Sequence, residues 1–106
     1  MKRYVVYVPE WVALEIQGQV LHIALDSVDR ALAWESRLVS AINGIGEHPG
    51  YAEDERMSRH FGRTVRRMVF ESRYLVFFSV KESAGVIEVL HFRHGARQSL
   101  GESGEA

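Results

Sequence analysis

The apolar positions in the first third of the chain repeat with the period of an α-helix. Between Glu10 and about Leu25 they recur every three or four residues, which predicts an amphipathic helix. Pro9 suits the start of this helix, because its missing N–H would have no partner in the first turn. Gly18 is expected to weaken or interrupt the helix. The expected apolar stripe consists of Val12, Ile16, Val20, Ile23 and Ala24, widened by Trp11, Leu14 and Leu21.

A second helix is predicted directly after the first. Asp26 or Ser27 can cap its N-terminus by accepting a hydrogen bond from an unpaired N–H, and glycines follow its expected end near residue 45. Glu35 interrupts the apolar stripe, and Trp34 falls beside it, where ordinary packing is favoured over contact with a partner. The stripe comprises Val28, Ala31, Leu32, Leu38, Val39, Ile42 and Ile45. Two helices joined by a short turn predict a helical hairpin.

The pattern changes to β-strands on either side of this hairpin. Residues 4–8 are β-branched or aromatic and stop at a proline, whereas residues 48–62 are polar and predict a loop with at most a short helical turn. Three further strands are predicted at 65–70, 74–80 and 86–93. Their short connections predict an antiparallel meander. The expected architecture is one α+β domain over residues 1–98, in the order β-α-α-β-β-β, with a flexible tail over 99–106.

The middle strand of the predicted meander is apolar on both faces. Its alternate residues on either side are nearly all hydrophobic, as in a strand that is covered on both sides. The helical hairpin can cover only one face. We therefore expect the second face to be an exposed apolar surface that a partner chain covers, with burial beneath the 48–62 loop as the alternative.

Composition and charge narrow the functional classes. The chain has 106 residues and no cysteine, which excludes disulfides, thiolate metal sites and a thiol nucleophile within it. With no secretory or membrane-spanning segment in the sequence, a cytoplasmic protein is expected. The net charge of −1 hides an asymmetry, because residues 1–55 carry −5 and residues 56–97 carry +6. The asymmetry indicates either a surface for an anionic partner or two halves that neutralise each other.

Basic side chains gather in two parts of the predicted meander, around its first hairpin and at the end of its last strand. They are Arg63, Arg66, Arg67, Arg73, His91, Arg93, His94 and Arg97. A guanidinium group binds phosphate or carboxylate through paired hydrogen bonds, so these side chains would suit nucleic acid or an acidic protein segment if the strands bring them together. Solvated charges at strand ends are the alternative.

No cofactor or metal motif accompanies these residues. His91 and His94 are three residues apart, which places them on opposite faces of a strand, and neither a cysteine nor a nearby carboxylate completes a zinc site. The sequence contains no phosphate loop, Rossmann glycine pattern or nucleophile elbow. We therefore predict neither a cofactor nor a metal.

The order of elements, together with several short motifs, is similar to a known family. The motifs, in chain order, are His48-Pro49-Gly50, Val65-Arg66-Arg67, Ser72-Arg73-Tyr74, Leu75-Val76-Phe77-Phe78 and the closing Val89-Leu90-His91-Phe92-Arg93-His94-Gly95-Ala96-Arg97. This ordered set, spread over residues 3–98, resembles the ParE branch of the RelE/ParE superfamily, the toxins of bacterial type II toxin-antitoxin systems. Its most specific part is the stretch from His94 to Arg97, together with Arg66 and Arg67.

The resemblance implies a small toxin, of the kind associated with plasmid stabilization, that a cognate antitoxin neutralises by wrapping its C-terminal segment over the toxin. ParE toxins act as DNA gyrase inhibitors, so the resemblance implies no catalytic residue. Binding of the target would then fall to Arg66, Arg67, Arg73, His91, Arg93, His94 and Arg97. The assemblies expected are a homodimer or a hetero-oligomer with the antitoxin.

The RelE branch of the superfamily supplies the alternative, a ribosome-dependent mRNA endoribonuclease. Its members use basic strand residues with a tyrosine or histidine near the C-terminus, and this chain has no tyrosine after Tyr74. In that case the proton would be transferred by His91 or His94, and the phosphate transition state would be stabilised by Arg66, Arg73 or Arg97. A third hypothesis is a relative of these toxins that is not toxic, since a net charge of −1 is low for a protein that binds nucleic acid.

Overall fold

A four-stranded sheet forms the centre of the molecule in a computed structural model, which describes residues 3–95. Its strands are β1 (Val5–Tyr7), β2 (Arg66–Phe70), β3 (Tyr74–Lys81) and β4 (Val86–His94). They lie in the order β1-β4-β3-β2, with β1 parallel to β4 and the other neighbours antiparallel. The predicted α+β class, element order and meander are confirmed. Arg97 and the tail predicted over 99–106 lie outside the described residues.

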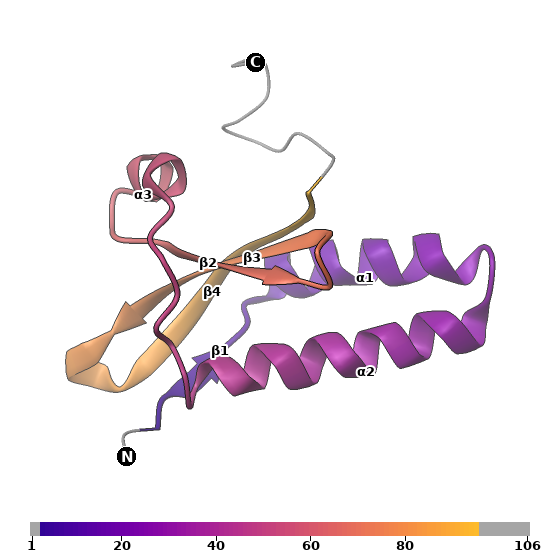
Figure 1. Ribbon diagram of the computed structural model, residues 1–106, viewed down its shortest axis with the longest axis horizontal. Helices are drawn as coiled ribbons and strands as arrows, with labels where there is room; N and C mark the ends of the chain where they lie inside the picture. Colours follow the sequence, from indigo (N-terminus) through magenta and orange to yellow (C-terminus); the bar gives the residue numbers. More distant parts are fainter. Residues whose placement is uncertain (1–2, 96–106) are drawn as a thin grey trace.

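The predicted helical hairpin is formed by α1 (Glu10–Ala24) and α2 (Val28–Ile45), which cover one face of the sheet (Figure 1). Ser27 caps α2, because its hydroxyl oxygen accepts a hydrogen bond from the backbone N–H of Arg30 at 3.1 Å. The expected interruption at Gly18 is wrong, since α1 is continuous. A glycine inside a helix costs only about 1 kcal/mol, which the burial of the neighbouring apolar side chains exceeds.

The buried faces of the two helices are narrower than the sequence pattern indicates. Trp11, Leu14 and Leu21 were expected to widen the stripe of α1, but all three are exposed. Three members of the expected α2 stripe are also exposed: Val28, Leu32 and Val39. The centre of the core is instead Trp34, whose ring makes edge contacts with Phe70, Tyr74 and Phe92. Ordinary packing of Trp34, favoured from the sequence, is therefore confirmed.

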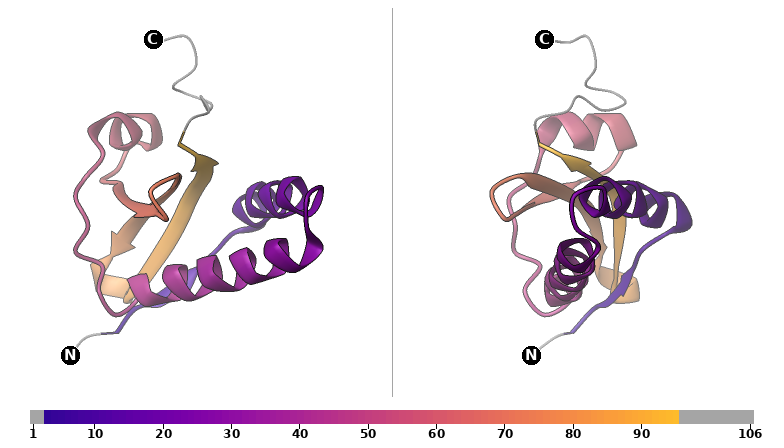
Figure 2. Two further views of the ribbon diagram at one scale, coloured as in Figure 1. Left: turned by 45° about the vertical axis from the view of Figure 1, so that its right-hand side comes forward. Right: turned by 90° about the vertical axis from the view of Figure 1, so that its right-hand side faces the viewer.

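The second face of the sheet is covered by a short helix of the same chain, α3 (Glu55–Phe61). Figure 2 shows α3 and the helical hairpin on opposite sides of the sheet. Met57 is fully buried against Val65, Phe77 and Leu90, and Phe61 packs beside them. The expected exposed apolar face is therefore wrong, and the alternative of burial beneath the 48–62 segment is confirmed. The mostly polar 48–62 segment can cover this face because α3 directs its two large apolar side chains, Met57 and Phe61, toward the sheet.

Local hydrogen bonds explain why α3 forms where it does. The Asp54 carboxylate accepts from the backbone N–H of Met57 at 3.0 Å, which caps the helix. Gly62 ends it in the left-handed conformation, with φ of 72°. The backbone N–H of Val65 then donates to the hydroxyl of Ser58 at 2.8 Å, which holds α3 close to the start of β2.

The outer edge of β4 is paired with a strand along only part of its length. β1 pairs with Val86–Glu88 and ends there, while β4 continues to His94. Beyond β1, two side chains of α1 form hydrogen bonds with the backbone of β4. The Trp11 indole N–H donates to the Leu90 carbonyl at 3.0 Å, and the Glu15 carboxylate accepts from the Phe92 N–H at 2.9 Å. Side chains of a helix thus satisfy an edge that would otherwise be open to another chain.

Candidate functional site

The turn between β2 and β3 lies above the helical hairpin and has a strained backbone. Its hydrogen bond runs from the Arg73 N–H to the Phe70 carbonyl, at 3.1 Å. Glu71 and Ser72 have positive φ angles of 52° and 61°, a conformation that L-residues other than glycine adopt only at a cost of about 1–3 kcal/mol. A turn with two positive φ angles matches the twist of the strands that it joins. It places Glu71 and Arg73 at the end of the sheet that faces α2.

The end of β4 lies beside this turn. Tyr74 pairs with His94, and the Gly95 N–H donates to the Arg73 carbonyl at 2.6 Å. A Cβ atom at Gly95 would lie only 2.8 Å from that oxygen, so the contact requires glycine. Two of the residues predicted from the sequence, Arg73 and His94, are therefore brought together.

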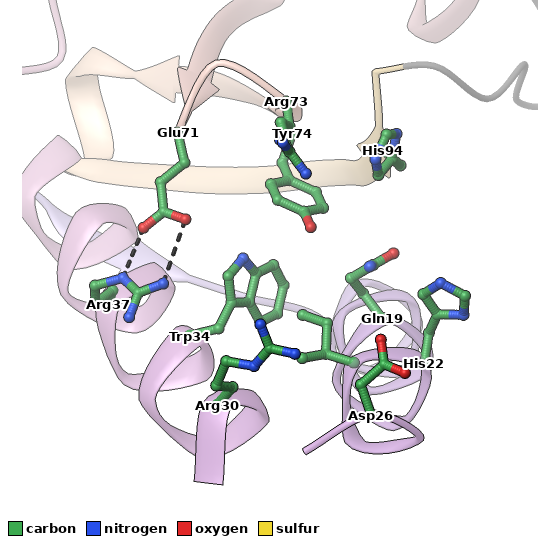
Figure 3. A pocket seen from close by; sticks show the side chains of 11 residues that line it. Gln19, His22, Asp26, Arg30, Trp34, Arg37, Glu71, Arg73, Tyr74 and His94 are labelled. Carbon is green, nitrogen blue, oxygen red and sulfur yellow. Dashed lines mark hydrogen bonds and ion pairs between the residues drawn. The ribbon is translucent and has the colours of Figure 1, made fainter. Parts of the chain in front are cut away.

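A cleft of about 420 Å³ lies between this end of the sheet and the turn end of the helical hairpin. We call it the hairpin cleft, and Figure 3 shows its lining side chains. The lining residues are Gln19, His22, Ile23, Asp26, Arg30, Trp34, Arg37, Glu71, Arg73, Tyr74 and His94. Its volume falls within the range of sites that hold small organic ligands.

Three nearly buried side chains form the inner wall of the hairpin cleft: Gln19, Trp34 and Tyr74. The Trp34 and Tyr74 rings meet edge to face at 5.1 Å, and Tyr74 contacts the His94 ring at the same distance. In Figure 3 the Tyr74 hydroxyl and the Gln19 amide point into the cleft. Within residues 3–95, the Trp34 indole nitrogen is buried without a hydrogen-bond partner. The wall therefore presents polar atoms where a closed core would present apolar ones.

The charged side chains of the hairpin cleft differ in how they are paired. Arg37 donates to both carboxylate oxygens of Glu71, at 2.7 and 3.4 Å, and this hydrogen bonding raises the pKa of Arg37 above its ordinary value. Arg30 and Arg73 have no ion-pair partner in the described part of the chain, and Asp26 is the remaining carboxylate of the cleft. With its histidines neutral, the hairpin cleft is positive by one charge.

Arg66 and Arg67 lie at the far end of β2 from Arg73. Arg66 pairs with Phe78 in the sheet, and its guanidinium donates to the Pro49 carbonyl at 2.7 Å. Arg67 lies 3.5 Å from the Asp54 carboxylate. These two arginines hold the segment that leads into α3, so the structure separates them from the pair formed by Arg73 and His94. The ion pair of Arg67 also joins the basic half of the chain to the acidic half.

His91 and Arg93 lie on the side of the sheet that α3 covers. The His91 ring stacks on Phe77 at 5.7 Å, and its Nδ1 lies 2.8 Å from the Glu15 carboxylate. Its Nε2 is buried and has no hydrogen-bond partner among residues 3–95. The Arg93 guanidinium lies 5.7 Å from the centre of the Phe77 ring. His91 thus connects α1 to β4 and faces away from His94, as their spacing of three predicts. Arg97, the remaining predicted residue, is outside the described residues.

Sequence reasoning missed the helical half of the hairpin cleft. Arg30 and His22 lie on either side of the turn between the two helices, and the sequence pattern assigns neither of them a role. Gln19 carried a usable signal, because it is a polar residue between Ile16 and Val20 on the buried stripe of α1. The cleft could not be found from this signal alone, since its other wall comes from residues more than fifty positions away.

Neither a scan against models of protein families nor a search of curated proteins gives a match. Among residues 3–95, no group of three or more histidine and carboxylate side chains is placed to hold a metal ion. No helix in the same region combines the length and apolar character needed to cross a membrane.

Proposed function

We propose that this protein is a ParE-like toxin of a type II toxin-antitoxin system, neutralised by a cognate antitoxin and acting on DNA gyrase. The proposal starts from the resemblance of residues 3–98 to that branch. The fold supports the proposal, because its elements follow the order that the resemblance implies: an opening strand, a helical hairpin and an antiparallel meander.

The observation that carries the proposal is a row of exposed leucines along the outside of α1 and at the residue that directly follows it, which we call the leucine row. Leu14, Leu21 and Leu25 are 65%, 60% and 83% exposed, and their spacing of seven and four residues places them on one side of the helix. Leu32 of α2 is exposed as well. Large apolar side chains gathered on one face are typical of a surface that another chain covers. An amphipathic segment of an antitoxin fits such a row through its own apolar face.

The positions of the histidines favour a gyrase inhibitor over a ribonuclease. His91 directs Nδ1 to Glu15 and buries Nε2, so neither ring nitrogen is presented to a substrate. His94 lies against the Tyr74 ring in the hairpin cleft. The proposal therefore assigns these side chains to binding and to the fold, and assigns none of them to catalysis.

Controlled expression in bacteria tests the proposal. We expect induction to cause filamentation and a DNA damage response, relieved by co-expression of the antitoxin, and we expect the purified protein to inhibit supercoiling by gyrase. The antitoxin to use is the product of an adjacent reading frame with a DNA-binding first half and an amphipathic second half. Immediate arrest of translation with mRNA cut at the ribosome, lost on His94→Ala, would establish the ribonuclease instead. Absence of any growth effect would leave a non-toxic binding module.

A matched pair of variants tests the leucine row separately. Leu21→Lys places a charge in the row, whereas Ser40→Lys places one on an exposed position of α2 outside it. We expect Leu21→Lys to stay toxic but to be relieved poorly by the antitoxin, and Ser40→Lys to be relieved as fully as the parent chain. Equal relief of both variants would show that the antitoxin binds elsewhere.

A further inference from the structure

The hairpin cleft contains polar groups that the proposed toxin activity does not use. Gln19, Trp34 and Tyr74 are each more than nine-tenths buried, yet the Gln19 amide and the Tyr74 hydroxyl point into the cleft (Figure 3). No hydrogen bond joins the Gln19 amide or the Tyr74 hydroxyl to another group within residues 3–95, and the Trp34 indole nitrogen is likewise without a partner there. A buried donor without a partner costs about 1–3 kcal/mol, so the unpaired indole N–H that the fold keeps beside this cavity, next to two polar groups directed into it, points to a bound ligand.

The chemistry of these groups defines the ligand. The indole N–H can only donate, and so can the guanidinium groups of Arg30 and Arg73, which lie on opposite walls (Figure 3). Neither arginine has an ion-pair partner in the described part of the chain. The Gln19 amide and the Tyr74 hydroxyl can donate as well. A cleft that is rich in donors and carries two unpaired guanidinium groups suits an anion with several acceptor oxygens.

We propose that the hairpin cleft binds a phosphomonoester of about mononucleotide size. A phosphomonoester carries a charge between about −1.5 and −2 at neutral pH and presents three acceptor oxygens, whereas a carboxylate presents one charge and two oxygens. Two arginines on opposite walls match the larger charge. The volume of about 420 Å³ exceeds the needs of inorganic phosphate alone and leaves room for an attached sugar and base.

Asp26 allows a test of whether the ligand of the cleft is negatively charged. Its carboxylate lines the cleft near Arg30 and repels an anion bound there. Neutralising it in Asp26→Asn should therefore tighten the binding of a phosphomonoester. Loss of either arginine should weaken it by about tenfold or more, which is the usual size of a charge-assisted hydrogen bond.

The experiment is a titration of the full chain, followed by calorimetry and by the two indole N–H resonances in NMR. The probes are AMP, inorganic phosphate and adenosine. We expect saturable binding of AMP, weaker binding of phosphate and none of adenosine. The indole signal of Trp34 should shift, while that of Trp11 should stay in place because its N–H is bonded to the Leu90 carbonyl. Saturable binding of adenosine equal to that of AMP, or no saturable binding of AMP, would overturn the proposal.

Variants provide the control for general charge effects. Arg30→Gln and Arg73→Gln remove exposed guanidinium groups of the cleft, and Arg59→Gln removes an exposed one from α3, on the other side of the sheet. The first two should lose affinity for AMP about tenfold, and Arg59→Gln should bind as the parent does. Equal losses in all three would overturn the assignment to the cleft. Thermal unfolding of each variant shows whether the fold is retained.

Oligonucleotides distinguish the two sources of a phosphomonoester, a free nucleotide and the 5′ end of a nucleic acid. Tighter binding of a 5′-phosphorylated oligonucleotide than of AMP would identify the chain end, and the reverse order would identify the free nucleotide. Equal binding of 5′-phosphorylated and 5′-hydroxyl oligonucleotides, each tighter than AMP, would overturn the proposal, because backbone charge would then be what the protein recognises. These measurements involve neither gyrase nor antitoxin, so they can fail while the proposed toxin function holds.

Discussion

Glu15 holds together two elements that are far apart in the sequence, and its removal should measurably destabilise the fold. One carboxylate oxygen accepts from the Phe92 backbone N–H at 2.9 Å, and the other lies 2.8 Å from His91 Nδ1. Both contacts lie on the part of β4 that β1 does not reach. Glu15→Ala therefore leaves a backbone N–H and an imidazole nitrogen without their partner.

The magnitude follows from the two contacts. A hydrogen bond from a backbone N–H to a carboxylate contributes about 1.5–3 kcal/mol. The contact with His91 adds about 0.5–1 kcal/mol at most, because the Glu15 side chain is 32% exposed and solvent screens the pair. We expect Glu15→Ala to lower the free energy of unfolding by about 2–4 kcal/mol, a large part of the stability of a domain of this size.

Urea unfolding measures this loss, with Gln17→Ala as the matched control on the exposed side of the same helix. The midpoint should fall for Glu15→Ala while the denaturant slope stays constant, and hydrogen exchange at the Phe92 amide should accelerate. Gln17→Ala should remain within about 0.5 kcal/mol of the parent chain. A Glu15→Ala loss no larger than that of the control would refute the view that α1 side chains secure the edge of β4.

Three further predictions test local features of the fold. Gly18→Ala should stabilise the protein by about 0.5–1 kcal/mol, because an added Cβ meets no atom within 4 Å, whereas Gly46→Ala should destabilise it, because the Cβ would lie 2.7 Å from the Tyr4 carbonyl; thermal melts compare the two. Met57→Ala should cost about 2–4 kcal/mol in urea unfolding, since this side chain covers the second face of the sheet. The hydrogen bond from the Tyr4 hydroxyl to Glu82 raises the pKa of Tyr4 above its ordinary value of 10.0, so its contribution to stability is complete below pH 10 and is lost as the pH rises through the folded pKa. Ultraviolet titration of the phenol should show a lower Tyr4 pKa in Glu82→Gln.

The elements set by local rules could be predicted from the sequence. Ser27 has the residue type of a helix cap and acts as one, and the short connections after β2 and β3 do produce a meander. The interruption at Gly18 was wrong because a single unfavourable residue counts for less than the packing of a whole helix face. Local propensity therefore gives the elements, and tertiary packing decides their continuity.

The surfaces of the molecule could not be predicted in the same way. The apolar pattern of α1 does not reveal which of its apolar residues face the sheet, so the sequence predicts Leu14 and Leu21 in the buried stripe although both are exposed. The helix that carries Met57 is too short to produce a periodic signal, and this is why the second face of the sheet was expected to be open. The hairpin cleft could not be predicted for a related reason. Arg30 and Arg73 line the same cleft only because the strained turn after β2 lies above α2.

The leucine row and the hairpin cleft lie on different sides of α1. Gln19 and Leu21 are two residues apart, which on a helix corresponds to about 200° of rotation, and the first is buried toward the cleft while the second is exposed. A helix of an antitoxin that covers the leucine row from outside does not need to enter the cleft. The two proposed sites can therefore be occupied at the same time, and a phosphomonoester should bind the isolated chain and its antitoxin complex alike.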